Sequence, residues 1–237
     1  MKKERIWELD AFRGLCILGM VVVHFVYDLR ELYHLADFPL PTFFLLVMNW
    51  GGVLFFLLSG ICVTLGSHPV KRGLLVFAAG MVCTLVTFGL YALGMAGDGV
   101  LIRFGVLHCL GICMLLWPLC KKLPSWAMIG ISAVVLALGY WFQTFTVSTS
   151  WLYSLGLVKE GFYSADFFPL LPNVGWFLLG AVLGRVLYKE KKTLFPKVPA
   201  EAFPIRFLSW CGRQSLFIYL LHQPVLTFIM ELCLRLV

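Results

Sequence analysis

The sequence has little charge. Only 13% of its 237 residues are charged, and 19 lysines and arginines outnumber 12 acidic residues, whereas soluble domains carry about 25% charged residues. With 61% hydrophobic residues, the chain has too few polar groups to cover a body that faces water. This composition excludes an ordinary soluble domain, a disordered chain, a collagen and a disulfide-rich secreted scaffold. We therefore expect lipid to be the solvent for most of the chain.

The chain also lacks the patterns of metal sites and of β-barrels. Its eight cysteines form no CxxC pair and lie mostly in apolar runs, with Cys109 beside His108 as the nearest approach to ligand spacing. We interpret them as buried apolar side chains and expect no metal site. Apolar and polar residues do not alternate with a period of two, which excludes a membrane β-barrel. The net charge of +7 comes from basic residues between apolar runs, which is typical of cytoplasmic loops and does not favour binding of nucleic acid.

Apolar runs that approach the length of a bilayer fill most of the sequence. A membrane helix needs about 20 residues, and seven runs come near that length: 11–32, 42–66, 73–93, 104–120, 125–143, 168–187 and 212–234. The run 104–120 is the weakest, because it is short and is interrupted by Trp117-Pro118. The sequence predicts an all-α, polytopic membrane helix bundle of about seven spans, with residues 1–237 forming a single domain.

Basic residues predict the orientation of the bundle. Lysine and arginine gather in cytoplasmic loops, and a cytoplasmic N-terminus places most of them on one side. These residues are Lys2, Lys3, Arg5, Lys71, Arg72, Lys121, Lys122, Lys189, Lys191, Lys192, Lys197 and Arg206. The C-terminus is then external. We expect the aromatic connection 144–167 to lie at the external headgroup level, and the proline-rich connection 189–206 to lead through an amphipathic segment into the last span.

Ionisable residues inside the spans are the first candidates for a functional site, because they are expensive to bury in lipid. On an ideal helix Arg13 and His24 differ by about 20° in azimuth and by about 16 Å along the axis, so they share a face. Asp10 lies three residues before Arg13, and Asp28 lies four after His24, which puts a carboxylate beside each basic group. The alternative is an arginine that extends to the membrane surface and a histidine that bonds a neighbouring helix.

Two more histidines are candidates for the same pocket. His108 enters the fourth run from its external end, and a rise of about 1.5 Å per residue places it at the depth of His24. This depth predicts a pocket shared by the two imidazoles. His34 lies in the external connection that follows the first run, near the expected mouth of that pocket.

Three other residues complete the candidate set. Asn49 in the second run faces the cavity or, alternatively, packs closely with its small neighbours. His222 precedes Gln223 and Pro224, so a role at a proline kink is favoured over a role in substrate binding. Arg103 lies at the external edge of the fourth run.

Five segments, in order, resemble a known family. In LDAFRG (9–14), Arg13 is followed after ten residues by His24, which resembles the R-x10-H signature of membrane acyltransferases. The other segments are FFLLSG (55–60), FGVLHCLGI (104–112), DFFPLLPNVGWFLLG (166–180) and GRQSLFIYLLHQPV (212–225). Together they are similar to the heparan-α-glucosaminide N-acetyltransferase catalytic-domain family in its short bacterial form.

The resemblance implies transfer of an acetyl group from cytoplasmic acetyl-CoA to an amino sugar or envelope glycan across a bacterial plasma (inner) membrane. The residues are compatible with that reaction. We expect Arg13, Asp10, Lys71 and Arg72 to bind CoA, with help from Lys121 and Lys122. We expect His24 with Asp28 to carry out catalysis, and the acceptor to be bound or the oxyanion stabilised by His108, Asn49, Arg103 and His222. The larger eukaryotic members carry Asn at the position of His24 and their active histidine nearest to His34, so the catalytic candidates are His24, His108 and His34, in that order.

The expected partners are membrane lipid and the carbohydrate acceptor. One copy of the chain encloses the CoA path or, alternatively, a homodimer completes it. Two other functions stay open from the residues alone. Arg13, His24 and His108 could line a proton-coupled path in a transporter or flippase, or the chain could be a partner subunit without catalytic activity.

Overall fold

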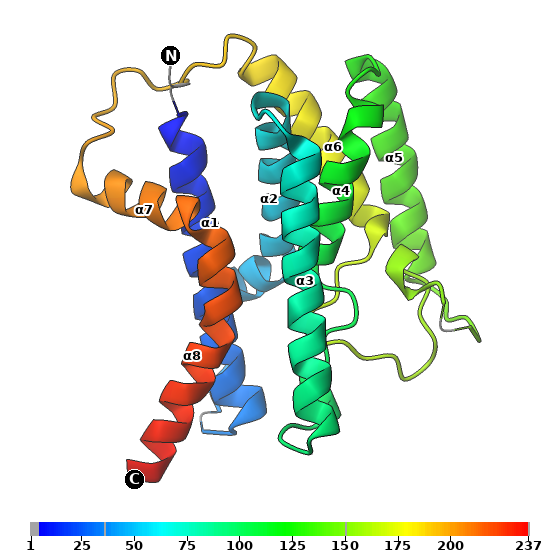
Figure 1. Ribbon diagram of the computed structural model, residues 1–237, viewed down its shortest axis with the longest axis vertical. Helices are drawn as coiled ribbons and strands as arrows, with labels where there is room; N and C mark the ends of the chain where they lie inside the picture. The colour runs from blue at the N-terminus through cyan, green and yellow to red at the C-terminus, as the bar shows by residue number, and fades with distance from the viewer. Residues whose placement is uncertain (1–4, 36, 150, 237) are drawn as a thin grey trace. The chain divides into compact units, whose positions relative to one another are not determined.

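The computed structural model describes residues 5–35, 37–149 and 151–236, and in these ranges every regular element is a helix (Figure 1). The elements are α1 (Trp7–Tyr27), η1 (Asp28–Leu32), α2 (Thr42–Leu65), α3 (Pro69–Ala92), η2 (Asp98–Val100), α4 (Val106–Cys120), α5 (Ser125–Phe142), η3 (Tyr153–Leu155), α6 (Leu170–Leu187), α7 (Phe203–Arg213) and α8 (Ser215–Leu236). The predicted all-α membrane bundle is confirmed. Lys2 and Lys3, on which the predicted orientation partly rests, lie outside the described residues.

Six described helices are long and apolar enough to cross a membrane. They are α1 together with η1, then α2, α3, α5, α6 and α8. The run 104–120 forms α4, which has 15 residues and falls short of the length of about 20 that a span needs. The run 212–234 is divided, because Gly212 and Arg213 end α7 and α8 begins at Ser215.

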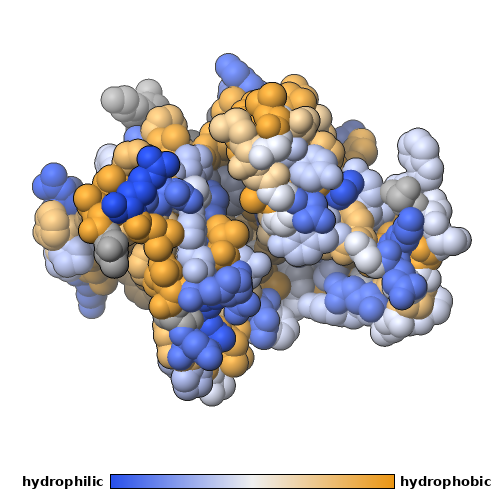
Figure 2. Space-filling view, turned by 90° about the horizontal axis from the view of Figure 1, so that it is seen from below, coloured by the Kyte–Doolittle hydropathy of each residue, from blue (hydrophilic) through white to orange (hydrophobic). Residues whose placement is uncertain are grey.

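Large apolar side chains remain exposed along these helices, as a membrane protein requires. Leu85 on α3 and Phe228 on α8 are 67% and 68% exposed, and lipid would cover such residues at little cost. Figure 2 looks at one end of the molecule, where hydrophilic residues lie among the hydrophobic ones. The apolar side chains exposed along the helices are thus suited to contact with lipid.

The chain divides into two compact units. The first comprises Met1–Phe55 and Glu190–Val237, and the second comprises Phe56–Lys189. The first unit therefore contains α1, η1, α7, α8 and the first part of α2, and the second contains the rest of α2 with α3 to α6.

In the first unit, α7 crosses α1 in close backbone contact (Figure 1). A Cβ atom added at Gly14 would overlap the carbonyl oxygen of Leu208, and one added at Gly212 would overlap the carbonyl oxygen of Asp10. Two glycines that face each other's helix let the backbones approach this closely. The outer side of α7 exposes Phe203 at 80%, so α7 is the amphipathic helix expected before the last span, although it begins only at the end of the connection 189–206.

The connection before α7 returns to the start of α1. Glu8 accepts hydrogen bonds from the Thr193 hydroxyl and from the Leu194 N–H, both at 2.8 Å. The rings of Trp7 and Phe195 lie 6.5 Å apart between centroids. The cytoplasmic end predicted for α1 is therefore held by the connection as well as by α7.

In the second unit, glycines again mark the closest helix contacts. A Cβ at Gly60 of α2 would overlap the backbone of Phe177 on α6, and a Cβ at Gly180 of α6 would overlap the backbone of Leu57 on α2. The other close pairs in this unit are α3 with α4 and α5 with α6. Arg185 of α6 donates to the carbonyl oxygens of Leu123 and Lys121, each at 2.7 Å, and so ties the end of α6 to the turn after α4.

The aromatic connection 144–167 folds back onto the start of α4. The N–H groups of Ala165 and Phe168 donate to the carbonyl oxygens of Leu101 and Phe104, at 2.9 and 3.1 Å. Its aromatic side chains stack on one another, with the Tyr153 and Phe162 rings 5.5 Å apart. The headgroup position expected for this connection stays a prediction.

The contact between α1 and α7 predicts a strong difference between two glycines of α1. Gly14→Ala forces the two backbones apart and should destabilise the protein by about 1–3 kcal/mol. Gly19→Ala is the matched control, because a Cβ at Gly19 meets nothing within 4 Å. Thermal unfolding in detergent measures both variants, and equal unfolding temperatures would contradict the close contact.

Candidate active site

His24 occupies the external half predicted for α1, and its ring is held in one orientation. Its Nδ1 lies 2.9 Å from the carbonyl oxygen of Met20. A carbonyl oxygen only accepts hydrogen bonds, so Nδ1 must carry the proton. In the neutral ring Nε2 then carries the lone pair. His24 therefore presents one nitrogen that can take up a proton.

His222 on α8 packs edge-on against His24. The centroids of the two rings are 4.8 Å apart, and their planes are inclined by 79°. His222 Nδ1 donates to the carbonyl oxygen of Tyr219, and its Nε2 is buried without a hydrogen-bond partner in the part of the chain that the structure describes. Sequence reasoning favoured a role at the Pro224 kink, but the structure brings His222 into contact with the first catalytic candidate.

Asp28 is the third member of this cluster and is almost fully buried, with 1% of its surface exposed. It begins η1, a π-helical turn that continues α1, and such turns are frequent at functional sites. Both carboxylate oxygens accept hydrogen bonds from the side-chain amide of Gln223, at 3.1 and 2.9 Å. Because the His24 ring is bonded to Met20 instead, Asp28 acts on that ring as a neighbouring charge.

Gln223 is the residue of this cluster that sequence reasoning missed as a functional candidate. The sequence feature that points to Gln223 is the adjacent polar pair His222-Gln223 inside an apolar run, and a proline kink at Pro224 also explains that pair. Gln223 links α8 to the start of η1 through Asp28, and its own Oε1 is buried without a partner among the described residues. His24, His222, Asp28 and Gln223 are named below as the imidazole cluster.

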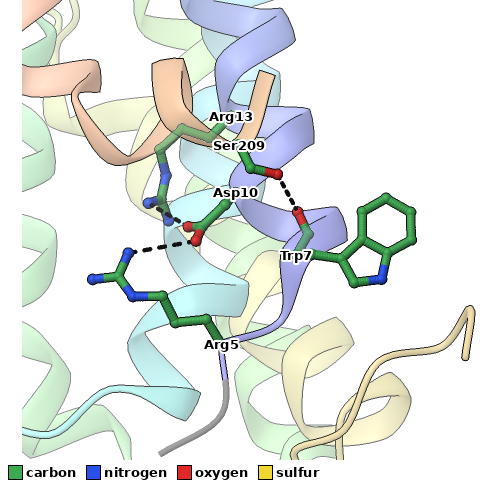
Figure 3. Close-up of polar contacts among 5 residues, drawn as sticks. All are labelled: Arg5, Trp7, Asp10, Arg13 and Ser209. Atoms are coloured by element: carbon green, nitrogen blue, oxygen red, sulfur yellow. Dashed lines mark hydrogen bonds and ion pairs between the residues drawn. The ribbon is translucent and has the colours of Figure 1, made fainter. Parts of the chain in front are cut away.

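Arg13 and Asp10 form the ion pair expected from their spacing. Arg13 Nη1 lies 3.6 Å from one Asp10 carboxylate oxygen, and Arg5 Nη1 lies 3.5 Å from the other. Figure 3 shows both guanidinium groups pointing toward Asp10, and the hydroxyl of Ser209 donating to the carbonyl oxygen of Trp7. Asp10 thus lies between two guanidinium groups at this end of α1.

His108 in the second unit differs from His24 in every contact. It is 3% exposed, its Nδ1 accepts from the Gly105 N–H at 3.1 Å, and its Nε2 donates to the Thr84 hydroxyl at 3.3 Å. The Phe104 ring stacks on it at 5.5 Å. With both nitrogens engaged, His108 caps the N-terminal turn of α4, and these contacts favour a structural role.

The other predicted site residues are distributed over both units. His34 is exposed in the loop after η1 with a positive φ of 51°, and Asn49 is exposed on α2. Arg103 donates through Nε to the carbonyl oxygen of Tyr163 at 3.2 Å, so it supports the connection 144–167. Lys71 and Arg72 are exposed on the first turn of α3.

Two groups of residues that the sequence predicts to act together are divided between the two units. His24 and Arg13 belong to the first unit, whereas His108, Lys71 and Arg72 belong to the second. The pocket shared by His24 and His108 therefore stays a prediction, as does the joint binding of CoA by Arg13 and the α3 residues. The first unit contains the whole imidazole cluster. It also contains Arg13 and Asp10, which lie on α1 with His24.

The capping role of His108 predicts the effects of two substitutions on stability. His108→Leu leaves the buried Gly105 N–H unpaired, which should cost about 1–3 kcal/mol. His108→Asn keeps an acceptor atom near the position of Nδ1 and should recover most of this loss. Thermal unfolding of the two variants in detergent measures the difference, and a Leu variant as stable as wild type would show that the cap is unimportant.

Comparison with known proteins gives one match. No curated protein and no solved structure matches the chain. The sequence model of the family described as heparan-alpha-glucosaminide N-acetyltransferase, catalytic, matches residues 5–224. This match spans all but the ends of the chain and includes the imidazole cluster and Arg13. The chain therefore belongs to the heparan-α-glucosaminide N-acetyltransferase catalytic-domain family of membrane acetyltransferases.

Proposed function

We propose that the protein transfers an acetyl group from cytoplasmic acetyl-CoA to an amino sugar or envelope glycan on the external side of a bacterial plasma membrane. The orientation follows from the basic residues of its loops, with the N-terminus in the cytoplasm and the C-terminus outside. Membrane lipid and the carbohydrate acceptor are the proposed partners, and a homodimer is the proposed assembly if one copy does not enclose the donor path. The observation that carries the proposal is the fixed His24 ring, whose Nε2 carries the lone pair, four residues before the buried Asp28.

The donor end of the site is assigned to Arg13. CoA carries its phosphates at one end and its thioester at the other, and guanidinium groups bind phosphates through paired hydrogen bonds. Arg13 and Arg5 bring two guanidinium groups to this end of α1, around Asp10. His24 lies on the same helix, eleven residues and about 16 Å further along the axis. One helix thus carries a group for each end of a long donor.

His24 supplies the base. As the acceptor nitrogen or oxygen attacks the thioester carbonyl carbon, His24 Nε2 takes the proton of that amine or hydroxyl. The new bond joins the acetyl carbon to the acceptor, the carbon–sulfur bond breaks, and the thiolate leaves and is protonated. The Asp28 carboxylate stabilises the imidazolium that forms. A two-step route, in which His24 Nε2 first carries the acetyl group, uses the same nitrogen.

The first prediction from this proposal concerns Nε2 of His24. His24→Asn keeps a side-chain donor for the Met20 carbonyl oxygen but has no atom at the position of Nε2. Its kcat/KM should fall by about 10²- to 10⁴-fold, the usual contribution of a general base. The assay follows label from radioactive acetyl-CoA into hexosamines and into envelope extract, with purified protein in nanodiscs.

His68→Asn is the matched control, because His68 is an exposed loop residue with a left-handed backbone that Asn tolerates. It should transfer acetyl groups like wild type. If wild type labels no acceptor and acetyl-CoA does not raise its unfolding temperature, the proposal is wrong. Uptake of a solute into liposomes without CoA would instead establish a transporter.

The second prediction concerns the donor end. Arg13→Gln removes a charged contact to phosphate and should raise the KM for acetyl-CoA about tenfold, since such a contact contributes about 1.5 kcal/mol. The KM for the acceptor should not change. Arg235→Gln on the last turn of α8 is the control for loss of one positive charge. An unchanged KM for acetyl-CoA in the Arg13 variant would assign the donor to another surface.

A further inference from the structure

Two buried polar atoms of the imidazole cluster have no hydrogen-bond partner in the described part of the chain. They are Nε2 of His222 and Oε1 of Gln223. Leaving such an atom unpaired costs about 1–3 kcal/mol, and native proteins rarely keep it without a reason. Both atoms belong to α8, next to the base and the carboxylate that α1 and η1 provide.

The carboxylate of Asp28 lacks a basic partner of the usual kind. Its two oxygens accept hydrogen bonds from Gln223, which is neutral, and the salt bridges found among the described residues do not include Asp28. A buried carboxylate is tolerated when a positive charge lies close to it. The ring of His24 is an ionisable group that interacts with Asp28 electrostatically, and the ring of His222 contacts that of His24.

The tautomers leave one nitrogen on each ring free to hold that charge. Both Nδ1 atoms already carry protons, because they donate to the carbonyl oxygens of Met20 and Tyr219. Any further proton must bind at Nε2 of His24 or of His222. With the ring centroids 4.8 Å apart, two protonated rings would repel each other, so the pair binds a second proton less readily than the first.

We propose that His24 and His222 share a single proton balanced by Asp28, with His24 as the base and His222 as the acid of the same reaction. This inference rests on the proposed acetyl transfer. His24 Nε2 takes the proton of the acceptor amine or hydroxyl as the new bond to the acetyl carbon forms. His222 gives its Nε2 proton to the sulfur as the carbon–sulfur bond breaks. The proton on His24 then passes to His222, which restores the starting state with no net gain or loss of protons.

Other charged and titratable groups lie near the pair on η1, on α8 and in the loop after η1. On η1, Arg30 lies 3.8 Å from Glu31. On α8, the Tyr219 ring is 5.5 Å from His222, and Glu231 accepts a hydrogen bond from Tyr33 at 3.4 Å. Burial, with Glu231 and Asp28 nearby, raises the pKa of Tyr33 above its usual range, so this phenol adds no charge at neutral pH. Asp28 is the carboxylate that interacts with the pair, through His24.

The first arm of the test is the dependence of kcat on pH. Wild type should give a bell-shaped profile, because activity falls when both rings are protonated and again when neither is. His222→Asn keeps the donor to the Tyr219 carbonyl oxygen but lacks Nε2. It should lose the high-pH limb, keep the low-pH limb and lower kcat by about 10²-fold, with little change in either KM. His68→Asn serves again as the control.

Asp28→Asn tests the counter-charge. Removing the negative charge disfavours the protonated pair, so the high-pH limb should move to lower pH. An unmoved limb would show that Asp28 does not balance the shared proton. Retention of both limbs and of wild-type kcat by His222→Asn would show that His222 is structural, and the inference would be overturned.

A second measurement is independent of activity. NMR of protein with ¹⁵N-labelled histidine should show His24 and His222 titrating in two linked steps in wild type, and His24 titrating in a single step in the His222→Asn variant. Two independent single titrations, or two neutral rings throughout, would contradict proton sharing even if transfer is observed. Linked titration in a wild-type protein that transfers nothing would instead overturn the proposed acetyl transfer and leave the proton pair intact.

Discussion

A negative charge buried in a membrane protein must be balanced, and this constraint organises the first unit. Asp28 is almost fully buried at the point where α1 passes into the π-helical turn η1. The side-chain amide of Gln223 on α8 donates hydrogen bonds to both of its oxygens. His24, four residues before Asp28, contacts the ring of His222. An uncompensated carboxylate costs several kcal/mol in such surroundings. The side chains that bond and balance Asp28 thus hold α1 and α8 together, although the two helices are far apart in the sequence.

The helix α1 joins this cluster to the ion pair of Arg13 with Asp10 near its other end. Arg13, His24 and the continuation to Asp28 lie on one helical segment, Trp7–Leu32, so their spacing is set by the rise of the helix. The connection through Glu8 and the contact with α7 at Gly14 hold the start of α1. The proposed donor-binding group and the proposed base are therefore kept at a fixed separation, as a long donor requires.

Histidines that look alike in the sequence have different chemistry in the structure. His24 and His108 were both expected in one pocket because each lies in an apolar run at a similar depth. The ring nitrogens separate them: His108 accepts from Gly105 and donates to Thr84, whereas His24 bonds through Nδ1 alone among the described residues. A histidine with both nitrogens bonded stabilises a helix end, and one with a free Nε2 can accept a proton. Hydropathy and depth carry no information about this difference.

The sequence by itself determined the membrane helix bundle, because a chain with so few charges can satisfy its backbone in lipid only through helices. It also determined the ion pair of Arg13 with Asp10, which follows from the period of a single helix. Tertiary structure decided the site. That His222 contacts His24, and that Gln223 bonds Asp28, depends on how α8 packs against α1, almost 200 residues away in the chain. Helical periodicity predicts neighbours within a helix, whereas contacts between helices arise only from packing.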